Sequence, residues 1–409
     1  MKNAALLLVL LAAAACERNP AGRDPEPDPK PDLSCVQTSS PAVLGLGCVA
    51  ERYTGEVSVG GRYVYTSTWS GGTGRRPGNA IKVWDAAGNV PVLVDSVIIT
   101  DAITTGDLQV TDDGKLLVVA TERSPGSIVV LSLADPRRPV QVSRFSSANT
   151  QPGVHTAEVA RVNGKLYAFL SVDPGASFPA RLVVVDLGNP ASPREVFSRQ
   201  MGQPFVHDVF VRDGILFTAL WSAGMTIWDI GGAGRGGSPE NPVELGNVRT
   251  VGGAVHNIWW LHTGGSKRFA IVGEEQGGFT GNSSAGDIHI VDVSDFGNPR
   301  EVAFYTVPGA GTHNFSVDEG RGVLYAAYYN GGVRALDVRG DLSACAASAR
   351  SADGRCDLTK AGREVGRTLD APINGRNFYI WGVQTTGDFV YASDMLNGLW
   401  KLDASKLRP

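Results

Sequence analysis

A short sequence pattern recurs along this chain and limits the folds that it can adopt. In each copy, a run of aliphatic residues ends in a polar residue, and a turn leads into another apolar segment. Residues 182–196 and 288–302 are the clearest copies, because both pass through Val-Asp and Asn-Pro and end in Pro-Arg-Glu-Val. Weaker copies end their aliphatic runs at Asp85, Ser132, Asp229, Asp337 and Asp403. Seven units separated by roughly 45 to 65 residues are typical of a propeller with four-stranded blades.

The first part of each unit also repeats. Residues 207–220 and 313–327 both start at a histidine, alternate apolar and polar residues, and pass through a glycine-containing turn into an aromatic-rich strand. Such alternation over short runs indicates β-strands, and no segment beyond the N-terminus keeps a helical period. The 51 glycines suit a chain with many tight turns. We therefore predict an all-β fold, a seven-bladed β-propeller over residues 35–409.

The two ends of the repeat region predict how the ring closes. Residues 43–49 precede the first full unit without a partner, and the last unit ends soon after Asp403, too early to supply its own outer strand. Closure removes exposed sheet edges, so we expect the N-terminal strand to complete the seventh blade. The repeated aspartates are expected to accept backbone hydrogen bonds from the following turns. Four tryptophans are expected to pack between blades: Trp84, Trp228, Trp259 and Trp400.

Four of the six histidines occupy one recurrent position, at the start of the innermost strand of consecutive units. They are His155, His207, His256 and His313. In a closed ring this position faces the central channel, where the second blade would add Asp107 and the seventh Trp381. Converging neutral imidazoles are typical ligands of Fe, Cu or Zn. The alternative is that these histidines form hydrogen bonds between blades as part of the repeat architecture.

Loop lengths favour a functional face at the same mouth of the channel. The long glycine-containing loops at residues 70–79, 173–180 and 276–286 would all leave the face where the inner strands begin. Loops on a rigid scaffold often carry recognition, so Glu274 and Glu275, which lead into the last loop, are candidate ligand-binding residues. We assign no role to His262 or His289.

The N-terminus has the features of a bacterial lipoprotein signal peptide. In residues 1–16, Lys2 precedes an apolar run, and alanines lead to Cys16, the residue that would be lipidated. An ordinary secretory signal cleaved among the same alanines is the alternative. The apolar run of about ten residues is too short to span a bilayer, so the membrane anchor would be lipid. Residues 17–34 are proline-rich and predict a disordered tether, and Glu17 favours the outer membrane.

Four further cysteines support an oxidising compartment of the cell envelope. Cys35 and Cys48 flank the N-terminal strand, whereas Cys345 and Cys356 lie in one insertion. Three pairings are open, and the two local pairs require the least rearrangement of the chain. The insertion is expected on the face opposite the histidines, as reinforcement.

The copies at residues 182–196 and 288–302 resemble the LVIVD repeat of bacterial surface β-propeller proteins. The resemblance covers residues 43–403 as a fold, with a sharp motif in two units. It implies a propeller and an exported location, and it implies little about function.

Composition and missing motifs narrow the function. The net charge of −4 and the lack of a basic stripe give no reason to expect nucleic acid as a partner. The sequence contains no nucleophile elbow, phosphate loop or paired-carboxylate motif. We therefore favour an envelope-anchored binding module that takes a metal, a small ligand or a partner protein at the histidine-lined mouth. The alternative is a metal-dependent enzyme with a multi-histidine axial site.

Overall fold

The computed structural model describes residues 34–408, apart from residues 37, 39, 71–74, 177, 203–204, 278–282 and 374. The signal peptide, Cys16 and nearly all of the tether predicted above lie outside the described residues. In the part of the chain that is described, no helix is both long and apolar enough to cross a membrane.

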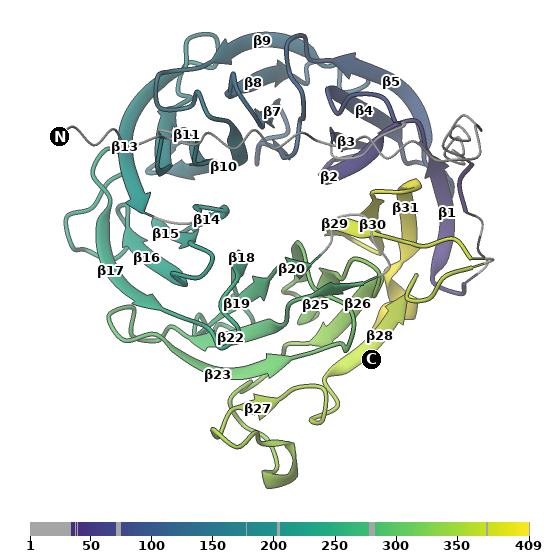
Figure 1. Ribbon diagram of the computed structural model, residues 1–409, viewed down its shortest axis with the longest axis vertical. Helices are drawn as coiled ribbons and strands as arrows, with labels where there is room; N and C mark the ends of the chain where they lie inside the picture. The colour runs from purple at the N-terminus through teal and green to yellow at the C-terminus, as the bar shows by residue number, and fades with distance from the viewer. Residues whose placement is uncertain are drawn as a thin grey trace, which may run out of the picture. The chain divides into compact units, whose positions relative to one another are not determined.

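Seven antiparallel sheets are arranged around a central axis, each with its first strand innermost (Figure 1). Blade 1 contains β2 (Tyr53–Gly60), β3 (Tyr63–Trp69), β4 (Ala80–Asp85) and β5 (Val92–Ile98). Blade 2 contains β6 (Leu108–Val110), β7 (Leu116–Thr121), β8 (Ser127–Ser132) and β9 (Val140–Phe145). Blade 3 contains β10 (Val154–Val162), β11 (Lys165–Val172), β12 (Ala180–Asp186) and β13 (Arg194–Gly202). Blade 4 contains β14 (Asp208–Arg212), β15 (Ile215–Ala219), β16 (Met225–Asp229) and β17 (Val243–Val248).

The remaining blades follow the same order of strands. Blade 5 contains β18 (Val255–Trp260), β19 (Phe269–Glu274), β22 (Ile288–Asp292) and β23 (Arg300–Tyr305). Blade 6 contains β24 (Phe315–Asp318), β25 (Val323–Ala327), β26 (Val333–Asp337) and β28 (Glu364–Thr368). Blade 7 contains β29 (Ile380–Thr386), β30 (Phe389–Asp394) and β31 (Gly398–Asp403), and its outer strand is β1 (Val43–Cys48). The prediction of a seven-bladed all-β propeller is confirmed.

The seventh blade combines the two ends of the folded region, as predicted. β1 pairs antiparallel with β31, from Val43 opposite Leu402 to Cys48 opposite Gly398. A disulfide joins Cys35 to Cys48 and holds the chain before β1 against this edge. A second disulfide joins Cys345 to Cys356, so both local pairings are confirmed.

The repeat pattern explains the local structure of each blade. The third strands β8, β12 and β22 are buried along nearly their whole length, as expected for aliphatic runs in the middle of a packed sheet. The side chain of the residue that ends the third strand of each blade, which is β31 in blade 7, then accepts the backbone N–H of the residue two positions later. This bond is made by Asp85, Ser132, Asp186, Asp229, Asp292, Asp337 and Asp403. The predicted structural role of this position is confirmed.

Three of the four tryptophans fill the space between blades, as predicted. Trp84, Trp228 and Trp400 are at most 2 % exposed. Trp259 differs from the prediction, because it is only half-buried and lines the central channel.

Side chains on the inner strands also link neighbouring blades. Five of them accept a backbone N–H from the inner strand of the next blade. The pairs are Ser58 with Val110, Gln109 with Val159, Glu158 with Val211, Ser316 with Thr385, and Gln384 with Val59. At the same position blades 4 and 5 carry Phe210 and Trp259, whose rings pack 5.4 Å apart. The bond from Val59 to Gln384 joins blade 1 to blade 7 and closes the ring.

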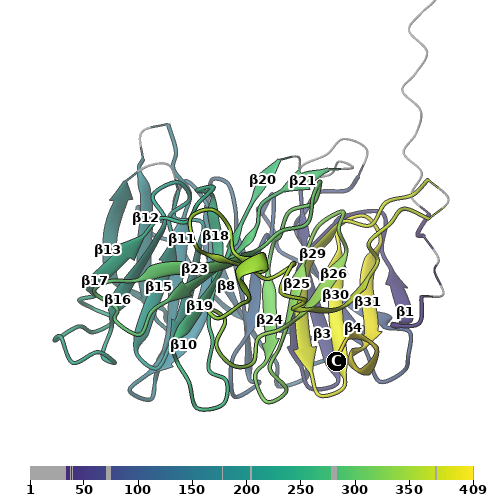
Figure 2. The ribbon, with the colours of Figure 1, turned by 90° about the horizontal axis from the view of Figure 1, so that it is seen from below.

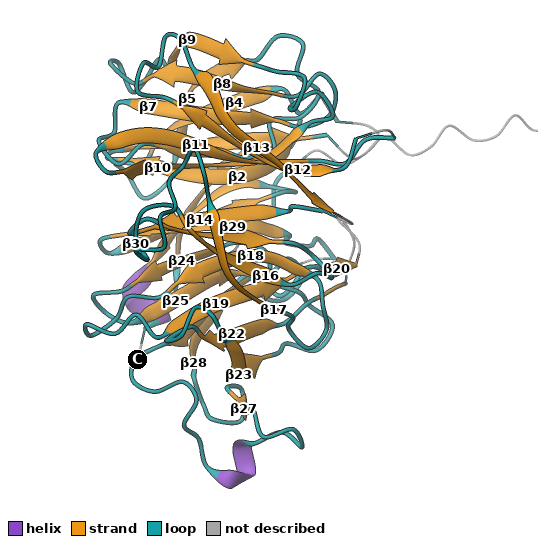
Figure 3. Cartoon of the chain, turned by 90° about the vertical axis from the view of Figure 1, so that its left-hand side faces the viewer, coloured by secondary structure: helices purple, strands orange, loops and turns teal. Residues whose placement is uncertain are grey.

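The cysteine-containing insertion leaves blade 6 between β26 and β28. It carries a short strand, β27 (Cys356–Asp357), which pairs in parallel with β23, the outer strand of blade 5. It also carries a short 3-10 helix at Ala347–Ala349, and the described residues contain one more, at Ala404–Leu407. Figure 3 shows the insertion beyond the rim of the ring. The insertion is therefore an addition to the neighbouring blade, which the sequence did not indicate.

Candidate metal centre at the channel mouth

The central channel contains a cavity of about 300 Å³ lined by the inner strands of all seven blades. At one end of this cavity the inner strands begin, and the four repeat histidines lie there. The hairpin of β20 (Gln276–Gly277) and β21 (Ser284–Ala285) rises from this face of the ring (Figure 2). We call this end of the cavity the channel mouth.

Local backbone irregularities place the histidines at the mouth. His155 and His256 each sit at a register shift between the first two strands of their blades, where one residue is left without a partner. Such a bulge re-aims a side chain, here toward the channel. His207 directly precedes β14, and His313 lies two residues before β24; their backbone N–H groups donate to Ala219 and Ala327.

The four imidazoles form a continuous arc around one side of the mouth. Ring centroids are 4.2 Å apart for His155 and His207, 4.1 Å for His207 and His256, and 4.1 Å for His256 and His313. Trp381 extends the arc, with its ring 4.3 Å from His313. The arc therefore contains five of the predicted site residues, and Glu275, a sixth, lies beside it.

The side chains behind this arc come from a second repeated position, at or just after the end of the second strand of each blade. They are Trp69, Glu122, Asp173, Trp221, Glu275, Tyr329 and Met395. Trp221 and Tyr329 have φ of 52° and 44°, values that residues other than glycine rarely adopt. Their rings lie 5.2 Å from His207 and 5.1 Å from His313.

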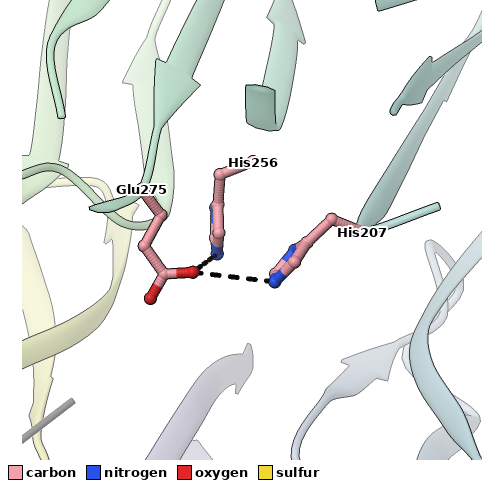
Figure 4. Close-up of side chains that lie close together, drawn as sticks. All are labelled: His207, His256 and Glu275. Atoms are coloured by element: carbon pink, nitrogen blue, oxygen red, sulfur yellow. Dashed lines mark ion pairs between the residues drawn. The ribbon is translucent and has the colours of Figure 1, made fainter. Parts of the chain in front are cut away.

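Three side chains at the mouth form a group that could hold a metal ion. Candidate ligand atoms of His207, His256 and Glu275 all lie within 4.8 Å of one another. Nε2 of His207 is 3.7 Å from Oε2 of Glu275, and Nε2 of His256 is 3.6 Å from the same oxygen (Figure 4). His155 and His313 lie beside this group and are not members of it.

His155 differs electrostatically from the other three histidines. Its Nδ1 lies 3.4 Å from Asp173 and 3.9 Å from Glu122, and its Nε2 lies 3.0 Å from Nε2 of His207. Burial opposes its charge, but the two carboxylates outweigh burial and raise the pKa of His155 to about 10. Gly106 makes room for this arrangement, because a Cβ there would lie 1.6 Å from Oε1 of Glu122.

The other three imidazoles are kept neutral. Burial, followed by the effect of neighbouring histidines, lowers the pKa of His207, His256 and His313 well below the usual range. Both ring nitrogens of His256 are buried without a hydrogen-bond partner, and Nδ1 of His207 and of His313 is in the same state. Neutral imidazoles with a free lone pair are the form that binds metals.

Glu275 is held in place by Tyr329. The tyrosine hydroxyl donates a hydrogen bond to Oε1 of Glu275, which leaves Oε2 facing the two histidines. Burial raises the pKa of Glu275, and the bond from Tyr329 opposes that shift. Because nearby cations favour a charged carboxylate, a metal ion here would favour the ionised form.

Asp107 faces the channel one layer below the histidines. It accepts backbone N–H groups from Leu108 at 2.8 Å and from Ala157 at 2.7 Å. In this layer, burial followed by Asp107 itself raises the pKa of Glu56 and of Asp208 to about 8. The carboxyl groups of Glu56 and Asp208 are therefore largely protonated at neutral pH, and Asp107 links blades 2 and 3.

Glu274, the neighbour of Glu275, does not reach the mouth. Its side chain is buried inside blade 5, where it accepts bonds from Thr250 at 2.5 Å and from Gly253 at 2.8 Å. His289, for which no role was predicted, lies 3.4 Å from Glu274. His262 lies near Asp213, away from the mouth.

Four residues at the mouth were not predicted as site residues from the sequence: Glu122, Asp173, Trp221 and Tyr329. An alignment of the seven units on the ends of their second strands would have placed them in one column with Glu275. Their varied chemistry hid this column, because it contains acids, aromatic residues and a methionine.

The fold and the mouth define a β-propeller with a histidine-lined axial site. The family model of the LVIVD repeat matches residues 176–200, and this chain is an LVIVD-repeat β-propeller, as the sequence resemblance predicted. The solved structure of Saccharomyces cerevisiae Sqt1 is similar, with a TM-score of 0.55 at 10 % identity over 90 % of this chain and 86 % of that one. At this identity the likeness shows the fold alone. No curated protein matches the sequence.

Proposed function

We propose that this propeller is an envelope-anchored binding module that holds a transition metal ion at the channel mouth. His207, His256 and Glu275 would be the protein ligands, and Fe, Cu or Zn the metal. The observation that carries the proposal is the approach of two neutral imidazole nitrogens to one carboxylate oxygen, at 3.7 and 3.6 Å.

These distances fit a metal ion of ordinary size. Zn²⁺ binds histidine nitrogen and carboxylate oxygen at about 2.0 to 2.2 Å, so two ligands at a tetrahedral angle are about 3.4 Å apart. The separations in the structure are slightly longer, and small side-chain rotations bring the atoms to that distance. Two histidines and one carboxylate are a donor set found around both Zn²⁺ and non-haem Fe²⁺.

The setting of the site favours binding of a further molecule. Three protein ligands leave a coordination position open toward the cavity, where a small ligand or a side chain of a partner protein can bind. Aromatic residues lie near this position. Trp381 and Tyr329 are buried, whereas Phe205 is 36 % exposed and packs 5.8 Å from Trp221. The two disulfides support the exported location, because such bonds persist in oxidising compartments.

Metal analysis of the purified protein tests the proposal. The wild-type protein, loaded with Zn²⁺ and dialysed, should retain about one ion per chain, and a His207→Ala, His256→Ala double variant should retain none. His262→Ala is the matched control, because it removes an imidazole away from the mouth and should leave the stoichiometry unchanged. Equal metal content in the double variant and the wild type would refute the proposal. Circular dichroism of each variant verifies that the propeller is intact.

A metal-dependent enzyme is the second candidate function, and the open coordination position favours it. In Co²⁺-loaded protein, added azide would change the visible absorption spectrum if an exogenous ligand can reach the metal. An unchanged spectrum would exclude inner-sphere chemistry at this site and leave the binding module as the function.

A further inference from the structure

We propose that His289 is a positioning residue for Glu275, acting through a buried chain of charged groups that ends in the disulfide-bonded insertion. The inference rests on the proposed function, because it explains how the carboxylate ligand of that metal site is fixed. The chain consists of Glu274, His289, Glu301 and Arg355.

The chain begins at Glu274, the residue before the metal ligand. Its carboxylate is 3 % exposed and 3.4 Å from Nε2 of His289. Nδ1 of His289 lies 2.8 Å from Oε1 of Glu301, so one imidazole separates two buried carboxylates. Oε2 of Glu301 accepts the backbone N–H of Val251 at 2.8 Å, and Gly253 donates to Glu274. The segment between blades 4 and 5 is thereby bound to both acids.

The chain ends at Arg355, which comes from the insertion of blade 6. Its guanidinium donates to Glu301 and lies 4.8 Å from the ring of Phe304. Arg355 directly precedes Cys356, which is bonded to Cys345 and pairs with Ala303 through β27. The disulfide and this strand pairing therefore fix the position of Arg355 on the outer side of blade 5.

Each group in the chain requires its neighbours. His289 is 1 % exposed, and the side chains of Glu274, Glu301 and Arg355 are at most 15 % exposed. Two carboxylates alternate with one imidazolium and one guanidinium, so the buried charges cancel as a set. Removing one member leaves an uncompensated buried charge, which is far more disruptive than losing a surface pair.

The backbone transmits the position of Glu274 to Glu275. Gly286 packs so closely against this segment that a Cβ would lie 1.9 Å from the carbonyl oxygen of Glu274. The N–H of Glu274 donates to Asp287, and the N–H of Glu275 donates to Ala254, both at 3.0 Å. Successive residues of a strand point to opposite sides, so anchoring Glu274 inside the blade directs Glu275 into the mouth.

A comparison of His289→Gln with the wild type tests the inference by two measurements on the full chain. We expect Zn²⁺ affinity, measured by calorimetry, to fall about 10- to 100-fold, which is the usual effect of losing an outer partner of a ligand. We also expect faster amide hydrogen exchange at residues 273–277 in the metal-free protein. Arg355→Ala should produce a smaller change of the same kind. Arg212→Ala is the matched control, because it breaks a comparable ion pair with Glu319 elsewhere, and it should change neither measurement.

The two measurements separate this inference from the proposed function. If the wild type binds no Zn²⁺, the metal site is refuted, and faster exchange at residues 273–277 in His289→Gln still supports positioning of Glu275. If the wild type binds Zn²⁺ and His289→Gln binds it equally well, with unchanged exchange, the inference is refuted and the metal site stands. The double variant His289→Gln, Glu274→Gln removes both charges and should recover part of the Zn²⁺ affinity. If His289→Gln lost affinity through unfolding, the second substitution would not restore it.

Discussion

At the scale of single residues, the four histidines of the mouth have different protonation states. His155 lies between two carboxylates and is charged, whereas burial keeps His207, His256 and His313 neutral. The charged imidazole can donate its Nε2–H to Nε2 of His207, which lies 3.0 Å away. In the metal-free protein the lone pair on Nε2 of His207 accepts this hydrogen bond. A bound metal ion would take the place of that hydrogen bond.

Tyr329→Phe should weaken metal binding about tenfold, because the tyrosine hydroxyl is the hydrogen-bond donor that opposes the raised pKa of Glu275. The loss should be larger at pH 6 than at pH 8, since a proton then competes better with the metal for the carboxylate. Calorimetry with Zn²⁺ at both pH values measures this effect. Tyr305→Phe is the control, because it removes a similar bond to Glu364 far from the mouth. An unchanged affinity in Tyr329→Phe would show that this bond does not support the ligand.

The stability of the metal-free protein should depend on pH through His289. Burial lowers the pKa of this imidazole, but Glu274 and Glu301 outweigh burial and raise it to about 9; Asp287 and Arg355 also face the cluster. A raised pKa in the folded state adds stability that is complete below the unfolded pKa of about 6.5 and is lost as pH rises through about 9. The contribution is about 3 kcal/mol. Urea unfolding at pH 6, 7.5 and 9.5 should show a steeper decline in the wild type than in His289→Gln, which keeps the decline due to His155. Parallel profiles would contradict this assignment.

At the scale of strands, the inner strands have two roles, which fall at different positions along their length. Their first residues supply the mouth, and residues further on bond to the next blade through Ser58, Gln109, Glu158, Ser316 and Gln384. These polar side chains line the channel and resemble a ligand-binding surface, but they have a structural role in joining the blades. The channel mouth and the links between blades are built from the same inner strands. The register of each strand therefore determines the position of both.

Gln384→Leu should lower the free energy of unfolding by about 1 kcal/mol, because the partly buried N–H of Val59 loses its acceptor at the junction of blades 7 and 1. Equilibrium urea denaturation measures the change. The metal affinity should remain as in the wild type, since Gln384 lies below the mouth. Thr385→Val is the control at the neighbouring position, where the backbone N–H to Ser316 is retained.

The register of strands also explains which parts of the site the sequence could predict. His155, His207, His256 and His313 were visible, because the same residue type recurs at the same place in four units. Glu275 and Glu274 were not distinguishable, since adjacent residues of a strand point to opposite sides and the sequence did not fix where β19 ends. Asp173 and Tyr329 were missed because their column has no shared chemistry.

At the scale of the whole molecule, the number of blades, the closure by β1 and the two disulfides could be predicted, because all of them follow from repeats and from short spacings along the chain. The contact of the insertion with blade 5 could not be predicted. It depends on parallel pairing of only two residues of β27 with β23, and no periodic signal marks so short a strand.

The proposed envelope anchor depends on Cys16, which lies outside the described residues. In a bacterial host, wild-type protein should incorporate labelled palmitate and fractionate with outer membranes. Cys16→Ser should remain unlabelled and be recovered in the soluble fraction, because one residue then loses the whole acyl anchor. Cys35→Ser with Cys48→Ser is the control, since it removes cysteines without affecting the predicted anchor. Labelling of Cys16→Ser would refute lipidation at this residue, and membrane recovery of the unlabelled variant would refute the acyl chain as the anchor.

The pairing of β1 with β31 imposes an order on biosynthesis. Among the described strands of the ring, β1 is made first and its partner β31 last. Until β31 has been made, β1 has no partner in the seventh blade, and an unpaired strand edge is prone to wrong association. A chain that is exported before it folds avoids this interval, since both ends then arrive in the same compartment before the ring is assembled.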